Sequence, residues 1–408
     1  MNKQFLAALL LGFAVWSNGF AQNNNSLSPY TRYGYGKLAD LAPASLQGMG
    51  GIAYGVRSPQ ILNSVNPAAV SAVDSMTFMF DVGLKLQAAW FNDQGKRSSK
   101  TVGGLEYVAL QFSVSRSFGI GIGFEPLSYI GYQYGGEQES LLGYDSYNGS
   151  GGFSRIYANL GYEIWKKRLS LGVKGAWMFG DKIHNRVYTP SESTADILSW
   201  PDSLHATGFM YEIGLQYSLP LSKKDELIVG LVYKPKTPFS AKTIQYEAQT
   251  VVKRSDDTPF DMPESYGIGF TYNRLNTLTA GADFQYQKWA DAQYYGTTDT
   301  LSNRMKINAG LEYIPNKNGQ RFLGRVRYRL GGFYSDSYFI DSNGSKSNEI
   351  GVNVGLGIPM TDRRSFVNVA FEYSHLMQKS PLSMSENYFK LTVSYTFNES
   401  WFHKRKLQ

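Results

Sequence analysis

Most of this chain alternates apolar and polar residues with a period of two. Residues 387–397 give the clearest example, where Phe389 and Leu391 alternate with Lys390 and Thr392. Because successive side chains of a β-strand leave on opposite faces, each such segment presents one apolar and one polar face. A strand with these two faces suits a transmembrane β-barrel, in which the apolar face meets lipid and the polar face lines the lumen.

The alternating segments predict fourteen antiparallel strands, joined by connectors that are alternately short and long. We place the strands at residues 76–91, 105–118, 119–134, 151–164, 169–187, 206–219, 226–235, 264–273, 276–289, 303–314, 323–334, 347–359, 365–375 and 387–397. Short turns of such barrels face the periplasm and long loops face outside. An even strand number therefore puts both chain ends on the periplasmic side. Residues 239–252 could form a further strand, but this would break the order of connectors, so we assign them to a folded external loop.

Composition agrees with a barrel and excludes helical spans. The 408 residues are 42% hydrophobic and 15% aromatic. A membrane-spanning helix needs an apolar run of about 18 residues, and the chain has no such run after its first 21 residues. Aromatic residues gather at the two membrane interfaces of a barrel. We expect them at the outer strand ends (Trp90, Tyr134, Tyr188, Tyr233, Trp289, Tyr334) and at the inner ends (Trp165, Tyr217, Tyr272, Tyr313, Phe397).

The amino terminus has the features of a secretory signal peptide, with Lys3 before an apolar run at residues 5–15. The expected parts are a signal peptide at 1–21, an amino-terminal plug (hatch) at 22–75, the transmembrane barrel at 76–397 and a periplasmic carboxy-terminal tail at 398–408. The absence of Cys excludes disulfides, Cys-ligated metals and a lipid anchor on an amino-terminal Cys. We therefore expect the outer membrane of a Gram-negative bacterium, with membrane lipid and the outer-membrane assembly machinery as partners.

Residues 22–75 do not alternate and contain Gly-rich, irregular sequence. A barrel of about fourteen strands is wide enough to need filling, so we expect this segment to pack in the lumen as a plug. The alternative is a disordered periplasmic arm, which the apolar content of the segment disfavours. The motif residues of the expected plug are Gly48, Gly50, Gly51, Asn66, Pro67 and Ala68.

Charged residues on the polar faces would line the lumen. They include both signs: Asp81, Lys85, Glu163, Lys174, Glu212, Asp283, Lys306, Glu312, Arg325, Arg327, Arg329, Glu372 and Lys390. Because an unpaired charge is costly to desolvate, this mixture favours ion pairs across the lumen, with ion selectivity as the alternative. The densest group of one sign, Arg325, Arg327 and Arg329, supplies the candidates for receiving an anionic head group.

The third predicted strand contains Pro126. Proline lacks the backbone N–H of a ladder, so it marks a bulge or an interruption of the strand. Interrupting the ladder of a closed barrel opens an edge in its wall. From the residues alone, a harmless bulge and a lateral opening of the wall are equally supported interpretations.

The chain resembles the long-chain fatty-acid transporter (FadL) family of outer-membrane proteins. The resemblance lies in three stretches and covers most of the chain: residues 45–51 with Asn66-Pro67-Ala68, residues 262–289, and residues 310–334. It implies a fourteen-stranded barrel, an internal amino-terminal hatch with the Asn-Pro-Ala turn, and passage of hydrophobic molecules that leave sideways where the third strand is kinked, here at Pro126. One departure is that the chain continues past Phe397, whereas such barrels commonly finish on a terminal aromatic residue.

No enzyme chemistry, cofactor site or metal site is expected. The four histidines, His184, His205, His375 and His403, lie far apart without the spacing of metal ligands or a catalytic triad. The net charge is +7 with basic residues dispersed along the chain, so we expect no nucleic-acid partner.

The function that these features predict is an outer-membrane channel that takes up hydrophobic or amphipathic, fatty-acid-like small molecules and releases them through the barrel wall. The alternative is a barrel that serves as a scaffold or shuttle in a protein secretion or surface-assembly complex. In that case the long loops 135–150, 188–205 and 236–263 would bind the partners.

Overall fold

The computed structural model describes residues 28–93, 96–135, 142–165, 168–192, 196–247, 250–275, 277–340, 346–377 and 384–400. The expected signal peptide at 1–21 and residues 401–408 of the expected tail lie outside the described residues. The predicted tail begins at residue 398, whereas the last strand continues to Ser400. No helix in these described ranges is long and apolar enough to cross a membrane.

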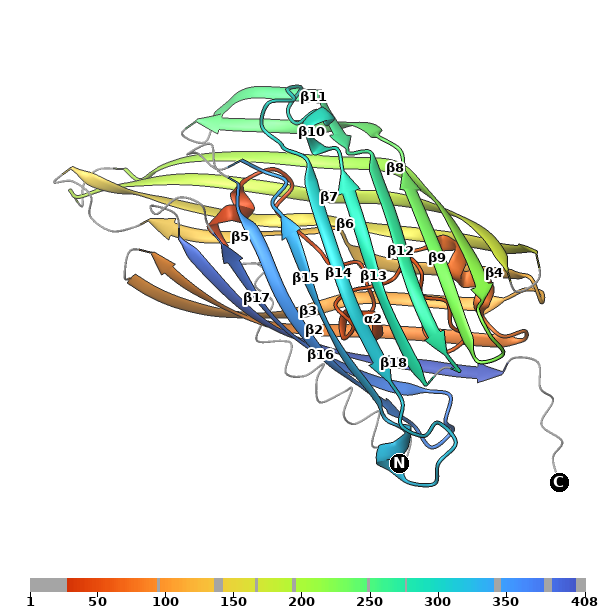
Figure 1. Ribbon diagram of the computed structural model, residues 1–408. Helices are drawn as coiled ribbons and strands as arrows, with labels where there is room; N and C mark the ends of the chain where they lie inside the picture. Colours follow the sequence, from red (N-terminus) through yellow and green to blue (C-terminus); the bar gives the residue numbers. More distant parts are fainter. Residues whose placement is uncertain are drawn as a thin grey trace, which may run out of the picture.

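The chain forms a closed, antiparallel β-barrel, and all fourteen predicted strands are present (Figure 1). They are β2 (Thr77–Asp93), β3 (Lys96–Ser113), β4 (Phe118–Pro126) with β5 (Ser128–Gly135), β6 (Gly143–Trp165), β7 (Leu169–Pro190), β8 (Leu198–Pro220), β9 (Asp225–Lys234), β12 (Ser265–Arg274), β13 (Leu278–Gln287), β14 (Arg304–Tyr313), β15 (Arg327–Asp336), β16 (Asn348–Pro359), β17 (Phe366–Met377) and β18 (Ser385–Ser400). The barrel closes where β18 pairs with β2, from Ser385 opposite Asn92 to Ser400 opposite Thr77.

The wall has the predicted apolar outer and polar inner faces. In β16, the side chains of Ile350 and Val352 are 47% and 58% exposed. Asn353, the next residue after Val352, is only 1% exposed. The same contrast in neighbouring strands gives the barrel a continuous apolar outer surface, which suits contact with lipid tails.

The third strand of the barrel is interrupted, because β4 ends at Pro126 and β5 begins at Ser128. Among the described residues, β3 pairs with β4 only between Val108 and Ser113. Beyond the break, β5 pairs with β6 on one side and with the short strand β1 (Lys37–Leu38) on the other. A strand of the amino-terminal segment thus covers the edge that the interruption leaves.

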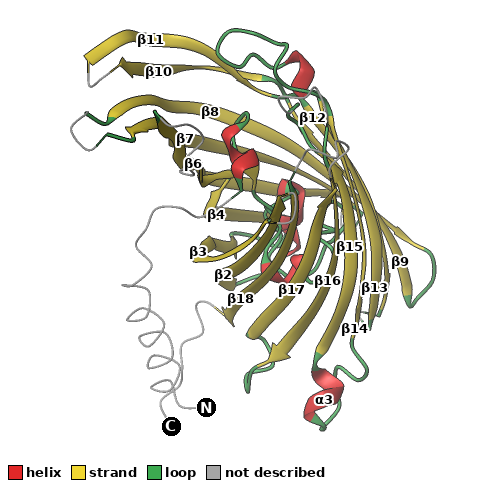
Figure 2. Ribbon diagram, turned by 90° about the vertical axis from the view of Figure 1, so that its left-hand side faces the viewer, coloured by secondary structure: helices red, strands yellow, loops and turns green. Residues whose placement is uncertain are grey.

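Three neighbouring strands are much longer than a membrane requires. β6, β7 and β8 have 23, 22 and 23 residues, whereas a transmembrane strand needs about 9–11. Residues 239–252, expected as a folded loop, belong to the hairpin of β10 (Thr237–Glu247) and β11 (Thr250–Met262), and β10 pairs with the extension of β8. Figure 2 shows these strands reaching beyond the rest of the wall. The hairpin therefore adds to a projecting sheet and does not change the barrel's strand number.

The described part of the amino-terminal segment lies in the lumen as a plug. Its elements are η2 (Pro29–Arg32), β1, α2 (Ala44–Gln47) and η3 (Pro67–Ala72). Leu46, Met49 and Ile52 are fully buried. The wall approaches the plug closely at glycines, since a Cβ on Gly230 would lie 1.8 Å from the carbonyl oxygen of Tyr54. The plug and the wall are thus packed to backbone contact.

Two predicted positions need correction. The strand expected from residue 323 begins at Arg327, because the residues before it form the short helix α3 (Phe322–Arg325). Arg325 therefore lies in a connector and not on the lumen face of a strand. Trp289, expected in the outer aromatic girdle, lies in η4 (Trp289–Asp291) and is 2% exposed.

Candidate functional site

A cavity of about 150 Å³ lies in the lumen between the plug and the wall. The plug contributes residues 38–42, Gly51, Tyr54 and Val65 to its lining, and the wall contributes residues of β8, β12, β13 and β14. Leu127 and Ser128, where the third strand is broken, also line it. The cavity therefore reaches from the centre of the lumen to the interruption of the wall.

The side of the cavity next to the break is apolar. Leu38 of the plug, Leu127 at the break and Met210 and Met262 of the wall line this part. They pack against the aromatic cluster around Tyr35, which is itself 1% exposed. The ring of Tyr35 lies 5.4 Å from that of Trp289, which also lines the cavity. A nonpolar group would be removed from water here.

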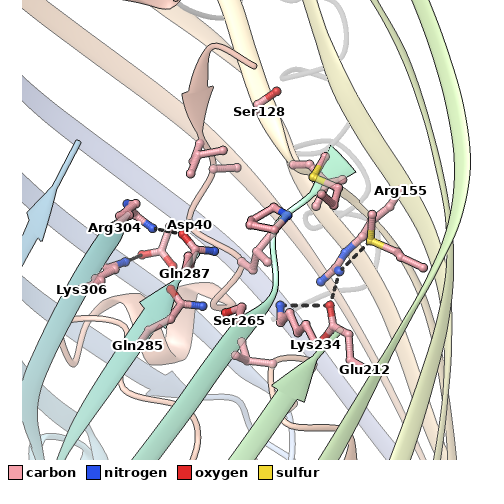
Figure 3. A pocket seen from close by; sticks show the side chains of 18 of the residues that line it. Asp40, Ser128, Arg155, Glu212, Lys234, Ser265, Gln285, Gln287, Arg304 and Lys306 are labelled. Atoms are coloured by element: carbon pink, nitrogen blue, oxygen red, sulfur yellow. Dashed lines mark hydrogen bonds and ion pairs between the residues drawn. The ribbon is translucent and has the colours of Figure 1, made fainter. Parts of the chain in front are cut away.

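The opposite side of the cavity is polar and includes the cationic side chain of Arg304 (Figure 3). The guanidinium of Arg304 donates to Gln287 Oε1 at 3.1 Å and to the carbonyl oxygen of Asp336 at 3.2 Å. Within the described part of the chain, Arg304 forms no ion pair with a carboxylate. Nearby, Lys306 lies 3.9 Å from Asp40 of the plug. Arg304 is thus a half-buried cation whose hydrogen bonds go to neutral acceptors, while the carboxylates of Glu349 and Asp40 stabilise its charge electrostatically.

A second charged group on the cavity wall is compensated. Arg155 lies 2.6 Å from Glu125 and 2.5 Å from Glu212, and Glu212 also lies 3.0 Å from Lys234 and 3.3 Å from Lys174 (Figure 3). Every one of these charges has a partner, as burial requires. This network therefore closes the wall and leaves Arg304 as the candidate for contact with a ligand's polar end.

The amino-terminal segment closes the lumen above the cavity. Lys182 donates to the carbonyl oxygen of Gly34 at 2.7 Å, and the hydroxyls of Tyr294 and Tyr338 donate to Gly34 and Gly36 at 2.7 and 2.6 Å. Burial raises the pKa of the Tyr338 phenol, so this group stays a hydrogen-bond donor at neutral pH. Side chains of the wall and the long loops thus hold the segment across the lumen.

Below the cavity, Arg57 ties the plug to the opposite end of the barrel. Its guanidinium lies 2.9 Å from Glu163 and donates to Ser71 at 3.0 Å. Burial lowers the pKa of the Arg57 guanidinium, and the Glu163 carboxylate opposes this shift. The plug is therefore attached to the wall on both sides of the cavity.

Strand β1 separates the cavity from two smaller ones. Each of these measures about 70 Å³, and Leu38 and Arg304 line all three. β1 is fixed to the wall by its two-residue ladder with β5, by the amide of Ala39 donating to Leu127 at 2.8 Å, and by the Lys37–Glu349 ion pair at 3.2 Å. Movement of this one short strand would join the three spaces.

The predicted motif residues of the plug have structural contacts. The Asn66 side chain accepts from the Ala68 amide at 3.0 Å and donates to Tyr54 at 2.8 Å, and Pro67 begins η3. Gly50 has a φ of +69°, and a Cβ there would lie 2.6 Å from the Gly332 amide nitrogen. A Cβ on Gly48 would lie 3.0 Å from the Cα of Gly355. Of these motif residues, only Gly51 lines the cavity.

The predicted head-group arginines lie elsewhere. Arg327 and Arg329 are buried and bind Glu312 at 3.3 and 2.7 Å, away from the main cavity, and Arg325 lies in α3. Sequence reasoning did not select Arg304 or Arg155 as site residues. Arg155 could have been found, because it has the same strand parity as the predicted Glu163.

The described residues hold no group of three or more His, Cys, Asp or Glu side chains that could bind a metal ion. His375 Nδ1 lies 2.8 Å from Asn387 Oδ1, and the neighbouring Ser374 hydroxyl donates to Glu349 at 2.8 Å. The histidine therefore has an amide partner, and the serine beside it is engaged by a different group.

Comparisons with known proteins add a family and a fold. A family model described as BamG matches residues 1–408. No curated protein matches the sequence. Among solved structures, the toluene transporter TbuX of Ralstonia pickettii has a TM-score of 0.60 and 13% identity over 90% of this chain and 99% of its own. A FadL homologue of Pseudomonas aeruginosa has a TM-score of 0.58 and 12% identity, over 87% of this chain and 98% of its own. The toluene transporter TodX of Pseudomonas putida has a TM-score of 0.56 and 14% identity, over 90% of this chain and 100% of its own. At these identities the likeness shows a shared fold.

Proposed function

Because the chain belongs to the BamG family and has the barrel fold of hydrocarbon channels, we propose that it is an outer-membrane channel for uptake of hydrophobic or amphipathic small molecules. In this proposal the long loops face outside, the short turns face the periplasm, and cargo leaves sideways through the wall. The observation that carries the proposal is the position of the cavity, which extends from Arg304 to the break at Leu127 and Ser128.

The size and lining of the cavity favour a small cargo with one polar end. A cavity of about 150 Å³ can hold a molecule the size of benzene. Its apolar side would receive the hydrocarbon part, and Arg304 would receive an oxygen-bearing polar end. A longer hydrocarbon would extend into the spaces beyond β1 after that strand moves.

Lateral release follows from the chemistry of such a cargo. Transfer of hydrocarbon from water into an apolar environment is favourable by about 0.8 kcal/mol per CH₂ group, so the bilayer is the preferred destination. The route to the short-turn end passes Arg57 and other buried polar groups of the plug. Leu127 lines the cavity at the interrupted wall, so a route past it avoids these polar groups.

Blocking the break tests the proposal. We expect Leu127→Trp to abolish uptake of a fluorescent fatty-acid analogue by cells that produce the protein, because the indole would fill the apolar side of the cavity. The matched control is Ile122→Trp on the exposed face of β4, where the wild-type side chain is 47% exposed. Uptake that is normal in Leu127→Trp, with both variants folded and present in the membrane, would contradict the proposed route.

The projecting sheet favours a second candidate, a scaffold or shuttle component of a secretion or surface-assembly complex. The extensions of β6, β7 and β8 with the β10–β11 hairpin exceed what a membrane span requires. Stable co-purification of a protein partner that is lost on deletion of residues 237–262, without any bound lipid by mass spectrometry, would support this candidate over the channel.

A further inference from the structure

The short connectors of the barrel concentrate its positive charge at one end. Among the residues that the structure describes, this short-turn rim comprises 114–117, 168, 221–224, 275, 277, 314–326 and 360–365. These residues include nine Lys or Arg and one Asp, a net +8. A cluster of basic residues therefore lies at one end of the barrel, although most Lys and Arg of the chain lie elsewhere.

The long-loop end lacks this basic excess. Its described residues between the barrel strands, 142, 191–192, 196–197, 235–247, 250–264, 288–303, 337–340, 346–347 and 384, contain nine Asp or Glu and six Lys or Arg. Lys96 and Arg97 at the start of β3 add two basic residues to this end. The short-turn end of the barrel is therefore much more basic than the long-loop end.

The short-turn rim also exposes bulky apolar side chains. The exposed fractions are 56% for Val114, 60% for Leu221, 55% for Leu275, 50% for Phe322 and 68% for Leu323. Turns that face only water are normally rich in polar residues.

Basic residues lie directly beside these apolar side chains in the sequence. Leu221 is followed by Lys223 and Lys224, and Leu275 is preceded by Arg274. In another connector, Arg168 lies 5.0 Å from the ring of Trp165, which is 53% exposed. Apolar side chains paired with long cationic ones are typical of surfaces that sit at the boundary between acyl chains and head groups.

We propose that the short-turn rim is a binding surface for the head groups of anionic phospholipids in the membrane leaflet that it borders. The apolar side chains would enter the acyl region, and the Lys and Arg side chains would contact the lipid phosphates. The rim surrounds the end of the barrel, and Figure 2 shows α3 at this end, below β14 and β15. A lipid leaflet contacts all sides of a barrel at once, whereas a protein partner contacts one side, so the distribution favours lipid.

Charge and distance set the expected strength. A basic side chain at an anionic lipid surface strengthens association about fivefold, and the attraction extends only over a screening length of about 10 Å at 0.1 M salt. The rim residues adjoin the strand ends, where the head groups of a surrounding leaflet would lie. The preference for anionic lipid should therefore be large in dilute buffer and decrease in concentrated salt.

Native mass spectrometry of the full-length protein tests the proposal. The detergent-purified protein is mixed with equal amounts of phosphatidylglycerol and phosphatidylcholine, and the retained lipids are counted. We expect at least an about fivefold preference for phosphatidylglycerol in the wild type. The preference should fall severalfold in the variant Lys223→Gln, Lys224→Gln, Arg363→Gln, Arg364→Gln, whose four positions are exposed in the rim.

The matched control removes four exposed basic side chains at the long-loop end, by Lys96→Gln, Arg97→Gln, Lys253→Gln and Arg254→Gln. It should keep the wild-type preference. Equal retention of the two lipids by the wild type, an unchanged preference in the rim variant, or an equal loss in the control would overturn the proposal. If the rim variant with four substitutions does not fold, the variant Arg321→Gln, Arg325→Gln provides the same comparison. Arg321 directly precedes α3 and Arg325 is its last residue, and we expect a partial loss of the preference for phosphatidylglycerol.

Discussion

At the scale of single residues, Arg155 is central to the buried charges of the barrel. Its guanidinium contacts both Glu125 and Glu212, and all three side chains are at most 4% exposed. Glu125 directly precedes Pro126, so this ion pair also fixes the end of β4 beside the break. Removing one partner of a buried pair leaves the others charged without compensation.

Arg155→Met should therefore destabilise the protein by about 3–5 kcal/mol, because the buried Glu125 loses the cation that pairs with it, whereas Glu212 keeps Lys174 and Lys234. The measurement is reversible urea unfolding of the purified protein in detergent, followed by tryptophan fluorescence. Arg186→Met is the control, since the Arg186–Asp145 pair is at the surface with the arginine 51% exposed, and such pairs contribute about 0–1 kcal/mol. Equal losses of unfolding free energy in the two variants would show that burial does not determine how much the Arg155 ion pairs contribute to stability.

Sequence alternation could predict which charges face the lumen but not which charges pair. Lys174, Glu212 and Glu312 follow the strand parity and are buried as expected. The partner of a wall residue lies on a neighbouring strand or on the plug, and its identity depends on the register between them. Arg304 could also have been found, because it lies within the predicted strand 303–314 on the same face as Lys306 and Glu312.

At the scale of elements, the short strand β1 of the plug has a smaller ladder than the wall strands beside it. It pairs with β5 over two residues, whereas β5 pairs with β6 over six residues. Gly36 precedes it with a φ of +88°, and a Cβ there would lie 2.5 Å from the carbonyl oxygen of Tyr129. Small contact area and a backbone that depends on glycine make β1 the element that can leave β5 at the lowest cost.

A disulfide between β1 and β5 tests this role. Leu38 lies opposite Ser128, and the chain contains no Cys, so the pair Leu38→Cys with Ser128→Cys should form one defined cross-link. We expect the oxidised variant to lose uptake of a fluorescent fatty-acid analogue and to recover it after reduction.

The control cross-link, Leu330→Cys with Val354→Cys, joins β15 and β16 in the continuous wall, where no movement is required. Its uptake should be the same in the oxidised and reduced forms. Normal uptake with β1 cross-linked to β5 would contradict a gating role for β1.

The sequence could predict the interruption of the third strand but not the strand that covers it. Pro126 is visible because proline lacks a ladder donor. A two-residue strand in an irregular segment has no periodicity to detect, so β1 could not be assigned before the fold placed it beside β5. The β10–β11 hairpin was missed as a pair of strands because most of β11 is exposed on both faces, which removes the alternation.

At the scale of the whole molecule, the plug and the barrel form one packed unit. The plug's backbone amides of Ala53 and Tyr54 donate to the Asp283 carboxylate of the wall at 2.6 and 2.9 Å. Arg57 and Lys37 add ion pairs to the wall at opposite ends of the plug. The plug is therefore held to the wall by hydrogen bonds and ion pairs at several positions.

Deletion of residues 22–75 should make the barrel leaky to small polar solutes and remove selective uptake of hydrophobic ones. The reason is that the plug supplies both the seal and one side of the cavity. Conductance across planar bilayers measures the leak, and the intact protein is the reference. Conductance that does not change on deletion would refute the role of this segment as a plug.

Photo-cross-linking can locate cargo in the cavity between Arg304 and the interrupted third strand. The probe is an amphipathic molecule that carries a diazirine on its hydrocarbon tail. After irradiation of the detergent-purified protein and peptide mapping by mass spectrometry, we expect labels on Leu127, Met210 and Met262. Labels confined to the outer face of the barrel, at residues such as Ile122, would contradict this location of the cargo.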